Sequence, residues 1–188
     1  MTTIGIVLAA GRSSRFGEAD KLSATFHGAP LAHYAAVAML GAAVDHRIVV
    51  VRPAVDRFDG FDIVYAPEGA PQSESLKHGV RRAIAIGADR IVITLADMPL
   101  VNAALIDAVV KRAGTDGTAA ATDGDRRAPP ACFPASAFPA LLALDGDRGA
   151  GQLLATLPDG ALVSVTEQEL ADVDTPADLV ALERALGG

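Results

Sequence analysis

The chain has 188 residues, of which 51% are hydrophobic, and its 23 acidic and 16 basic side chains give a net charge of −7. This composition supports a sizeable core and argues against a general nucleic-acid or membrane-surface binder, which would need a basic face. The single cysteine, Cys132, excludes an internal disulfide, so we expect a cytoplasmic protein of one domain, residues 1–188, with no signal peptide and no transmembrane span.

Short apolar segments rich in Val and Ile alternate with helix-like segments along the chain. In chain order, the predicted strands are Thr3–Leu8, Arg47–Val51, Phe61–Tyr65, Arg90–Leu95, Gly117–Ala121, Pro130–Phe133 and Leu162–Val165. The predicted helices are Pro30–Leu40, Ser73–Ile86, Asn102–Ala113, Pro134–Leu144, Gly149–Thr156 and Pro176–Leu186. This alternation predicts a three-layer, doubly wound α/β fold with a mostly parallel sheet, from which the loop at 122–130 departs.

Polar clusters follow several of these strands, at the edge where α/β sheets bind ligands. The first, Ala9–Lys21, combines small residues with Arg12, Arg15 and Lys21. Exposed backbone N–H groups and cationic side chains in such a loop suit a polyphosphate. The segment matches neither the P-loop nor the GxGxxG pattern. The alternative is a glycine-rich surface loop with solvated charges.

Aspartates mark two further clusters. Asp97 ends a hydrophobic strand in "TLADMPLV", where a carboxylate suits Mg²⁺ shared with substrate phosphates; it could equally close a turn or cap the next helix. In "DVDTPADL", Asp172 and Asp174 would share one face of an extended strand, and one of them could complete a metal site with Asp97. The alternative is a simple helix start at Asp-Thr-Pro.

The segment "PQSESLKHG" places Gln72, Ser73 and Ser75 at a predicted helix N-terminus, where their side chains could bind a nucleobase edge or simply cap the helix. The polar segments "DRRAPP" (125–130) and "GDRGA" (146–150) could contact a second substrate. The four histidines lack the spacing of a zinc site, and no GxSxG motif is present.

Taken in order, these segments resemble a known family. Leu8-Ala9-Ala10-Gly11, followed by Ser13, Arg15-Phe16-Gly17 and Lys21-Leu22, is similar to the signature of nucleoside-triphosphate transferases, most closely those that attach CMP or GMP to molybdopterin. The likeness continues through "GAPL" (28–31), "PQSESLKHGVRRA" (71–83), "TLADMPLV" (94–101), "GDRGA" and "DVDTPADL" (172–179), and so covers nearly the whole chain.

The resemblance implies a Rossmann-like fold of the nucleotide-diphospho-sugar transferase type and Mg²⁺-dependent transfer of a nucleotide to a phosphorylated acceptor, with release of pyrophosphate. The implied nucleotide-binding residues are Leu8, Ala9, Ala10, Gly11, Gln72 and Ser75. The implied catalytic residues are Arg15, Lys21 and Asp97, and the implied metal ligands are Asp97 and Asp174. The loops around Arg126–Pro130 and Gly146–Gly149 would face the acceptor.

The implied partners are a nucleoside triphosphate, a molybdopterin-like acceptor and a molybdenum hydroxylase as client, with the enzyme itself a monomer. Ala10, which makes the motif LAAG, favours CTP over GTP. Glu74 departs from the family pattern, because its negative charge would be unfavourable if it faced the nucleotide. Two alternatives remain: a cytidylyl- or uridylyltransferase for a sugar or polyol phosphate, and a non-catalytic nucleotide- or cofactor-binding chaperone.

Overall fold

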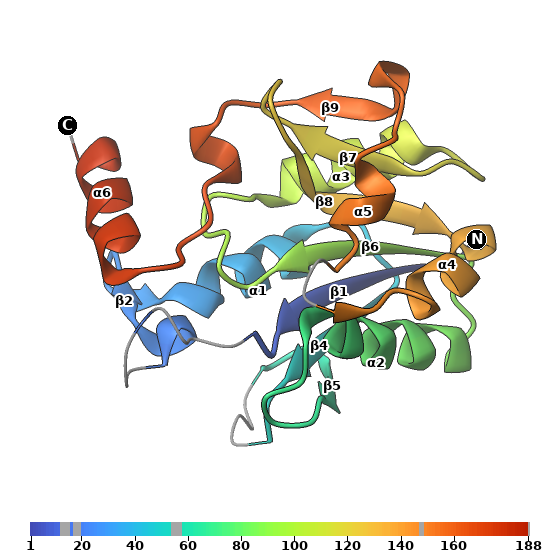
Figure 1. Cartoon of the computed structure of the whole chain (residues 1–188), viewed down its shortest axis with the longest axis horizontal. Coiled ribbons are helices and arrows are strands. Elements are labelled where there is room, and N and C mark those ends of the chain that lie inside the picture. Colours follow the sequence, from blue (N-terminus) through green and yellow to red (C-terminus); the bar gives the residue numbers. More distant parts are fainter. Residues whose placement is uncertain (12–15, 17–19, 54–57, 147–148, 188) are drawn as a thin grey trace.

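The computed structural model describes residues 1–11, 16, 20–53, 58–146 and 149–187. Its centre is a seven-stranded sheet in the order β5-β4-β1-β6-β8-β7-β9 (Figure 1). The strands are β1 (Thr3–Ala9), β4 (His46–Val51), β5 (Asp62–Tyr65), β6 (Arg90–Leu95), β7 (Ala119–Thr122), β8 (Arg127–Pro134) and β9 (Leu162–Ser164). Only β8 runs antiparallel to its neighbours in this sheet, so the prediction of a mostly parallel sheet is confirmed.

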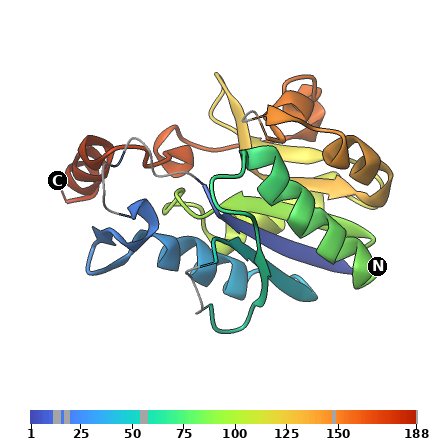
Figure 2. The same cartoon turned by 60° about the horizontal axis from the view of Figure 1, so that its bottom comes forward.

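Helices cover both faces of the sheet. The helices α1 (Leu31–Gly41) and α3 (Ala103–Ala113) pack on one face. On the other face lie α2 (Gln72–Ala85), α4 (Phe138–Leu142) and α5 (Gly151–Leu154); Figure 2 shows α2, in green, lying along the sheet. In β1, Ile4 and Ile6 contribute to the core under α2, whereas Val7 and Ala9 contribute to the core under α1. Burial on both faces explains the continuous apolar strands, and the three-layer prediction is confirmed.

A smaller unit lies beside the carboxyl end of β1. It consists of a hairpin of β2 (Thr25–Phe26) and β3 (Ala29–Pro30) together with α6 (Pro176–Leu186). Phe26, Leu31 and Leu182 share its separate apolar cluster. The hairpin was not predicted from the sequence; its turn has a positive φ at both His27 and Gly28. Single turns of 3₁₀ helix occur at η1 (Lys21–Ser23), η2 (Ala135–Ala137), η4 (Asp159–Ala161) and η5 (Gln168–Leu170).

Three predicted elements differ from the observed ones. The loop at 122–130 is not an excursion: β8 already begins at Arg127, and Thr122 pairs with Arg127 across a β7–β8 hairpin. The predicted helix Pro134–Leu144 is reduced to η2 and the short α4, in which Pro139 lies in the first turn, where its missing N–H causes no loss. The predicted helix Gly149–Thr156 is likewise shortened to Gly151–Leu154.

Gly5 is the point of closest approach between β1 and α1. A Cβ built on Gly5 would lie 2.2 Å from Sδ of Met39, which is itself fully buried. We therefore expect Gly5→Ala to lower the free energy of unfolding by about 1–3 kcal/mol through overpacking. Urea denaturation measures this, with Gly160→Ala as the control, because a Cβ on Gly160 would meet no atom within 4 Å. Equal stability of the two variants would contradict the prediction.

Within the part of the chain that the structure describes, no helix combines the length and the apolarity that a bilayer span requires.

Candidate nucleotide-binding site

A pocket opens where the carboxyl ends of β1 and β6 meet the N-terminus of α2. Its lining residues are Leu8, Ala10, Gly11, Lys21, Leu22, Gln72, Ser75, Leu95 and Asp97. From β1 the chain proceeds to β4 and β5 on one side and then crosses back to β6 on the other side. The pocket therefore lies at a topological switch point of the sheet, the usual ligand position in open α/β folds.

The side chains of the N-terminal motif point to both faces of the sheet, and those on one face line this pocket. Leu8, Ala10 and Gly11 line it, while the side chain of Ala9 packs in the core under α1 and borders a second pocket on that side of the sheet. This alternation follows from the extended backbone of β1, which ends at Ala9. A contact between Ala9 and a nucleotide in the first pocket would consequently use backbone atoms.

The N-terminal turn of α2 forms the opposite wall. Among the described residues, no side chain caps this end of the helix, which begins after Pro71. Gln72 and Ser75 face the pocket, and the buried hydroxyl of Ser75 has no hydrogen-bond partner within the described residues. A Cβ on Gly149 would lie 2.9 Å from Oε1 of Gln72, so Gly149 approaches the same amide. Ser73, the third polar residue expected here, is buried and does not line the pocket.

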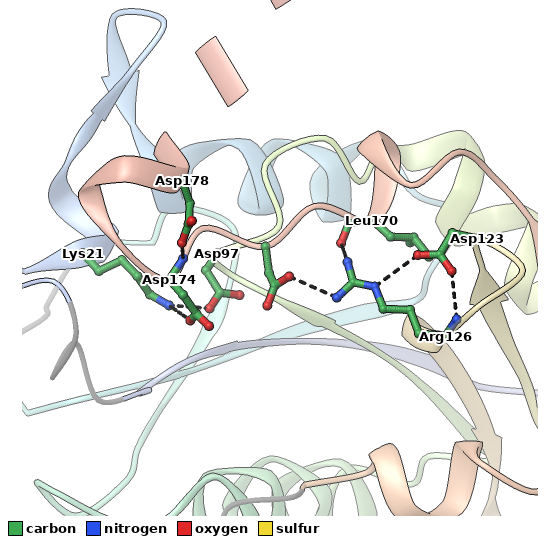
Figure 3. Close-up of polar contacts among 8 residues, drawn as sticks. Lys21, Asp97, Asp123, Arg126, Leu170, Asp174 and Asp178 are labelled. Carbon is green, nitrogen blue, oxygen red and sulfur yellow. Dashed lines mark hydrogen bonds and ion pairs between the residues drawn. The ribbon is translucent and has the colours of Figure 1, made fainter. Parts of the chain in front are cut away.

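Lys21 meets two carboxylates at one edge of the pocket (Figure 3). Its Nζ lies 2.6 Å from Oδ2 of Asp97 and 3.3 Å from Oδ1 of Asp174. The three residues come from η1, from the end of β6 and from the segment before α6, and are separated by 76 and 153 positions along the chain. The structure thus brings together the lysine and the two aspartates that the sequence singled out.

The short helix η1 explains why Lys21 points inward. Asp20 caps η1 by accepting the N–H of Leu22 at 3.4 Å, and its Oδ1 also pairs with Nη2 of Arg52 at 2.5 Å. Arg52 directly follows β4, so this ion pair fixes η1 against the sheet edge. Neither Asp20 nor Arg52 was singled out from the sequence, although a charged residue immediately after an apolar strand is the signal that led to Asp97.

Among the described residues, two carboxylates share the single ammonium group of Lys21. Burial raises the pKa of Asp97 above its ordinary value, and the pair with Lys21 offsets this only in part. Burial alone would lower the pKa of Lys21, but the charges of Asp97 and Asp174 outweigh it, and the pKa is raised. Both shifts favour the form that carries the additional proton.

Asp97 and Asp174 fit a divalent ion as ligands. Oδ1 of Asp97 is buried and has no hydrogen-bond partner among the described residues, which leaves one carboxylate oxygen available to a ligand. The described residues contain no group of three or more His, Cys, Asp or Glu side chains arranged around one point. Mg²⁺ commonly needs only one or two protein carboxylates, because substrate phosphates and water complete its coordination.

The other expected site residues fall into three groups. Arg15 and Arg12 lie outside the described residues. Asp172 does not share a strand face with Asp174, because residues 171–174 form no strand, and its Oδ1 accepts a hydrogen bond from Nη1 of Arg126 at 3.1 Å. Glu74 does not line the pocket: it pairs with Lys77 at 2.7 Å, and this hydrogen bond lowers its pKa.

Fold and pocket together define a three-layer α/β protein with a pocket at the switch point of its sheet. Residues 5–162 match the family model described as "MobA-like NTP transferase domain". The chain therefore belongs to the MobA-like NTP transferase family and is a nucleotidyltransferase.

Relatives of this chain carry more specific names. It is 32% identical to the "Purine catabolism protein PucB" of Bacillus subtilis over 203 residues, covering 97% of each chain. It is also 32% identical to a molybdenum cofactor guanylyltransferase of Cereibacter sphaeroides over 134 residues, covering 70% of this chain and 68% of that one. Among solved structures, Rv0371c of Mycobacterium tuberculosis superposes with a TM-score of 0.83 at 24% identity, covering 98% and 99% of the chains; it has also been solved in complex with manganese.

Proposed function

We propose that this nucleotidyltransferase moves CMP from CTP to a phosphorylated, molybdopterin-like acceptor and releases pyrophosphate, with Mg²⁺ as cofactor. The observation that carries the proposal is the cluster of Lys21, Asp97 and Asp174 beside the pocket at the ends of β1 and β6. A catalytic centre needs such a cluster more than a binding module does. The relatives named as molybdenum cofactor guanylyltransferases support the acceptor class.

The reaction needs little acid–base chemistry from the protein. An oxygen of the acceptor phosphate attacks the α-phosphorus of the nucleotide, and the bond from that phosphorus to the oxygen bridging the β-phosphate breaks. A phosphate nucleophile is already ionised at neutral pH, so no general base is required. The main obstacle is the repulsion of two anions, which positioning and positive charge reduce.

The proposed roles follow from where the residues lie. Ser75 and Gln72 hold the base edge, Leu8, Ala10 and Gly11 form the wall of the pocket, and Ala9 contributes backbone contacts. Asp97 and Asp174 would hold Mg²⁺, which would supply positive charge at the α-phosphate and the leaving group. The ammonium group of Lys21 would contact the triphosphate. Arg15 is proposed for the same phosphates from the family resemblance, as is a molybdenum hydroxylase as the client of the product.

The preference for CTP rests on Ala10 of the LAAG motif, and a thermal-shift panel tests it. CTP, GTP, UTP and ATP are each added with Mg²⁺ and with EDTA. We expect the largest stabilisation from CTP with Mg²⁺, because both the base and the metal bind only to the folded state. Selective stabilisation by GTP would show that the substrate is GTP and not CTP. If none of the nucleotides raises the melting temperature, the proposed nucleotide site is wrong. Pyrophosphate release from CTP and molybdopterin then separates catalysis from a binding-only chaperone.

A further inference from the structure

The segment that carries Asp174 has no regular secondary structure of its own. Residues 171–174 connect η5 to α6, and one backbone contact ties them to the sheet: the N–H of Val173 donates to the carbonyl oxygen of Asp97 at 2.9 Å. After Asp174, the carboxylate of Asp178 accepts the N–H groups of Asp174 at 3.0 Å and Thr175 at 2.7 Å. This capping box fixes the end of the segment that lies nearer α6.

Arg126 holds the opposite end. It lies in the turn between β7 and β8, and its guanidinium donates to the carbonyl oxygen of Leu170 and to Oδ1 of Asp172 at 3.1 Å (Figure 3). Its Nε donates to Oδ2 of Asp123 at 3.2 Å. Asp123 is well placed to orient the arginine, because its side chain is only 6% exposed and its Oδ1 also accepts the backbone N–H groups of Asp125 and Arg126.

We propose that Arg126 is a positioning residue for the metal site: it fixes the segment from Leu170 to Asp172 to the β7–β8 hairpin, so that Asp174 meets Lys21 and Asp97. This inference rests on the proposed function of Asp174 as a metal ligand. The buried side chain of Val173 anchors the middle of the segment. The contacts of Arg126 restrict the conformational freedom that remains, whose loss would otherwise oppose metal binding. Partners behind a metal ligand commonly influence metal affinity in this way.

The geometry calls for an arginine at this position. The acceptors on Leu170, Asp172 and Asp123 lie in different directions from the side chain, and the planar fork of a guanidinium can donate to all of them at once. The neighbouring Arg127 points elsewhere. Its guanidinium contacts the carbonyl oxygen of Ala155 and lies 3.8 Å from Oδ1 of the exposed Asp159. Because the loop that contains Arg127 is expected to face the acceptor, the matched control is Arg112 on α3, whose Nη1 donates to the carbonyl oxygen of Gly160 at 3.2 Å and which does not line the pocket.

The test compares CTP binding with Mg²⁺ and with EDTA by isothermal titration calorimetry. The dissociation constant in EDTA divided by the dissociation constant with Mg²⁺ measures how strongly the metal contributes to binding. We expect Arg126→Ala to lower this ratio about 10-fold, the usual effect of removing a residue that orients a metal ligand. Affinity in EDTA should be unchanged, because Arg126 does not line the nucleotide pocket. Arg112→Ala should leave both values unchanged, and Arg126→Lys, which retains one contact to Asp172, should give an intermediate ratio.

Two further variants distinguish failure of this inference from failure of the proposed metal site. Asp174→Asn should lower the ratio at least as much as Arg126→Ala; an unchanged ratio in Asp174→Asn would remove the metal role of Asp174. If Asp174→Asn lowers the ratio and Arg126→Ala does not, the positioning role is wrong. Arg126→Ala combined with Asp172→Ala should be no worse than Arg126→Ala alone, because both act through one contact. Additive losses would contradict that route.

Discussion

Asp97→Asn is expected to lower kcat for pyrophosphate release by about 10²–10³-fold, the usual effect of removing one group that stabilises charge in the transition state. An amide keeps the shape of the side chain and can still accept a hydrogen bond from Nζ of Lys21, which lies 2.6 Å from Oδ2 in the wild type. It supplies no negative charge for Mg²⁺. Steady-state assays over a range of Mg²⁺ concentrations measure the loss.

The control for this variant is Asp62→Asn. Asp62 begins β5 and pairs with Nε of Arg82 at 2.5 Å, away from the pocket. Its loss should leave kcat unchanged, because isolated surface pairs contribute little to stability or activity. Turnover like the wild type in Asp97→Asn would remove the metal role of this residue.

In the absence of metal, the stability of the wild type relative to Asp97→Asn should depend on pH. From the sequence, Asp97 would be an exposed strand-end carboxylate; in the structure its side chain is only 20% exposed, and burial raises its pKa. A raised pKa in the folded state gives stability that is present below the ordinary carboxyl pKa and is lost as pH rises through the raised value. The wild type should therefore lose stability relative to Asp97→Asn across that interval, which urea melts at several pH values would measure.

Lys21→Ala is expected to weaken CTP binding about 10- to 100-fold, since a charge-assisted hydrogen bond contributes about 1.5–3 kcal/mol. CMP, which lacks the β- and γ-phosphates, should lose much less affinity. Calorimetric titration with both nucleotides gives the comparison within one variant. Because Lys21 is 7% exposed and its removal leaves Asp97 and Asp174 facing each other, the variant should also lose about 1–3 kcal/mol of stability.

The comparison of CTP with CMP separates a loss of the triphosphate contact from a general effect of reduced stability, because reduced stability would weaken binding of both nucleotides. Lys111→Ala provides the matched control, because Lys111 lies exposed in the last turn of α3 and does not line the pocket. It should bind both nucleotides like the wild type. Equal losses for CTP and CMP in Lys21→Ala would argue against a contact between Lys21 and the triphosphate.

Hydrophobic patterning predicted most of the fold because both faces of the central strands are buried. The segment "IVITL" is apolar at every position except Thr94, and the corresponding β6 lies between helices on both faces. The first residue of α6 was also predictable, since Thr175 and Pro176 form a local N-terminal cap. The β2–β3 hairpin was not, because its strands are two residues long and derive their stability from Phe26 packing against residues far along the chain.

By itself, the sequence determined which chemical groups stand at the carboxyl ends of the strands: the small residues after β1, Asp97 after β6, and the polar turn of α2. This much is local, because strand ends and helix starts depend on neighbouring residues. Only the tertiary structure decided how the distant charges pair. Asp172 and Asp174 are two positions apart, yet one bonds Arg126 and the other Lys21. Arg126 lies 46 positions from Asp172, and Lys21 lies 153 positions from Asp174. A pattern of neighbouring residues cannot predict pairs that far apart in the chain.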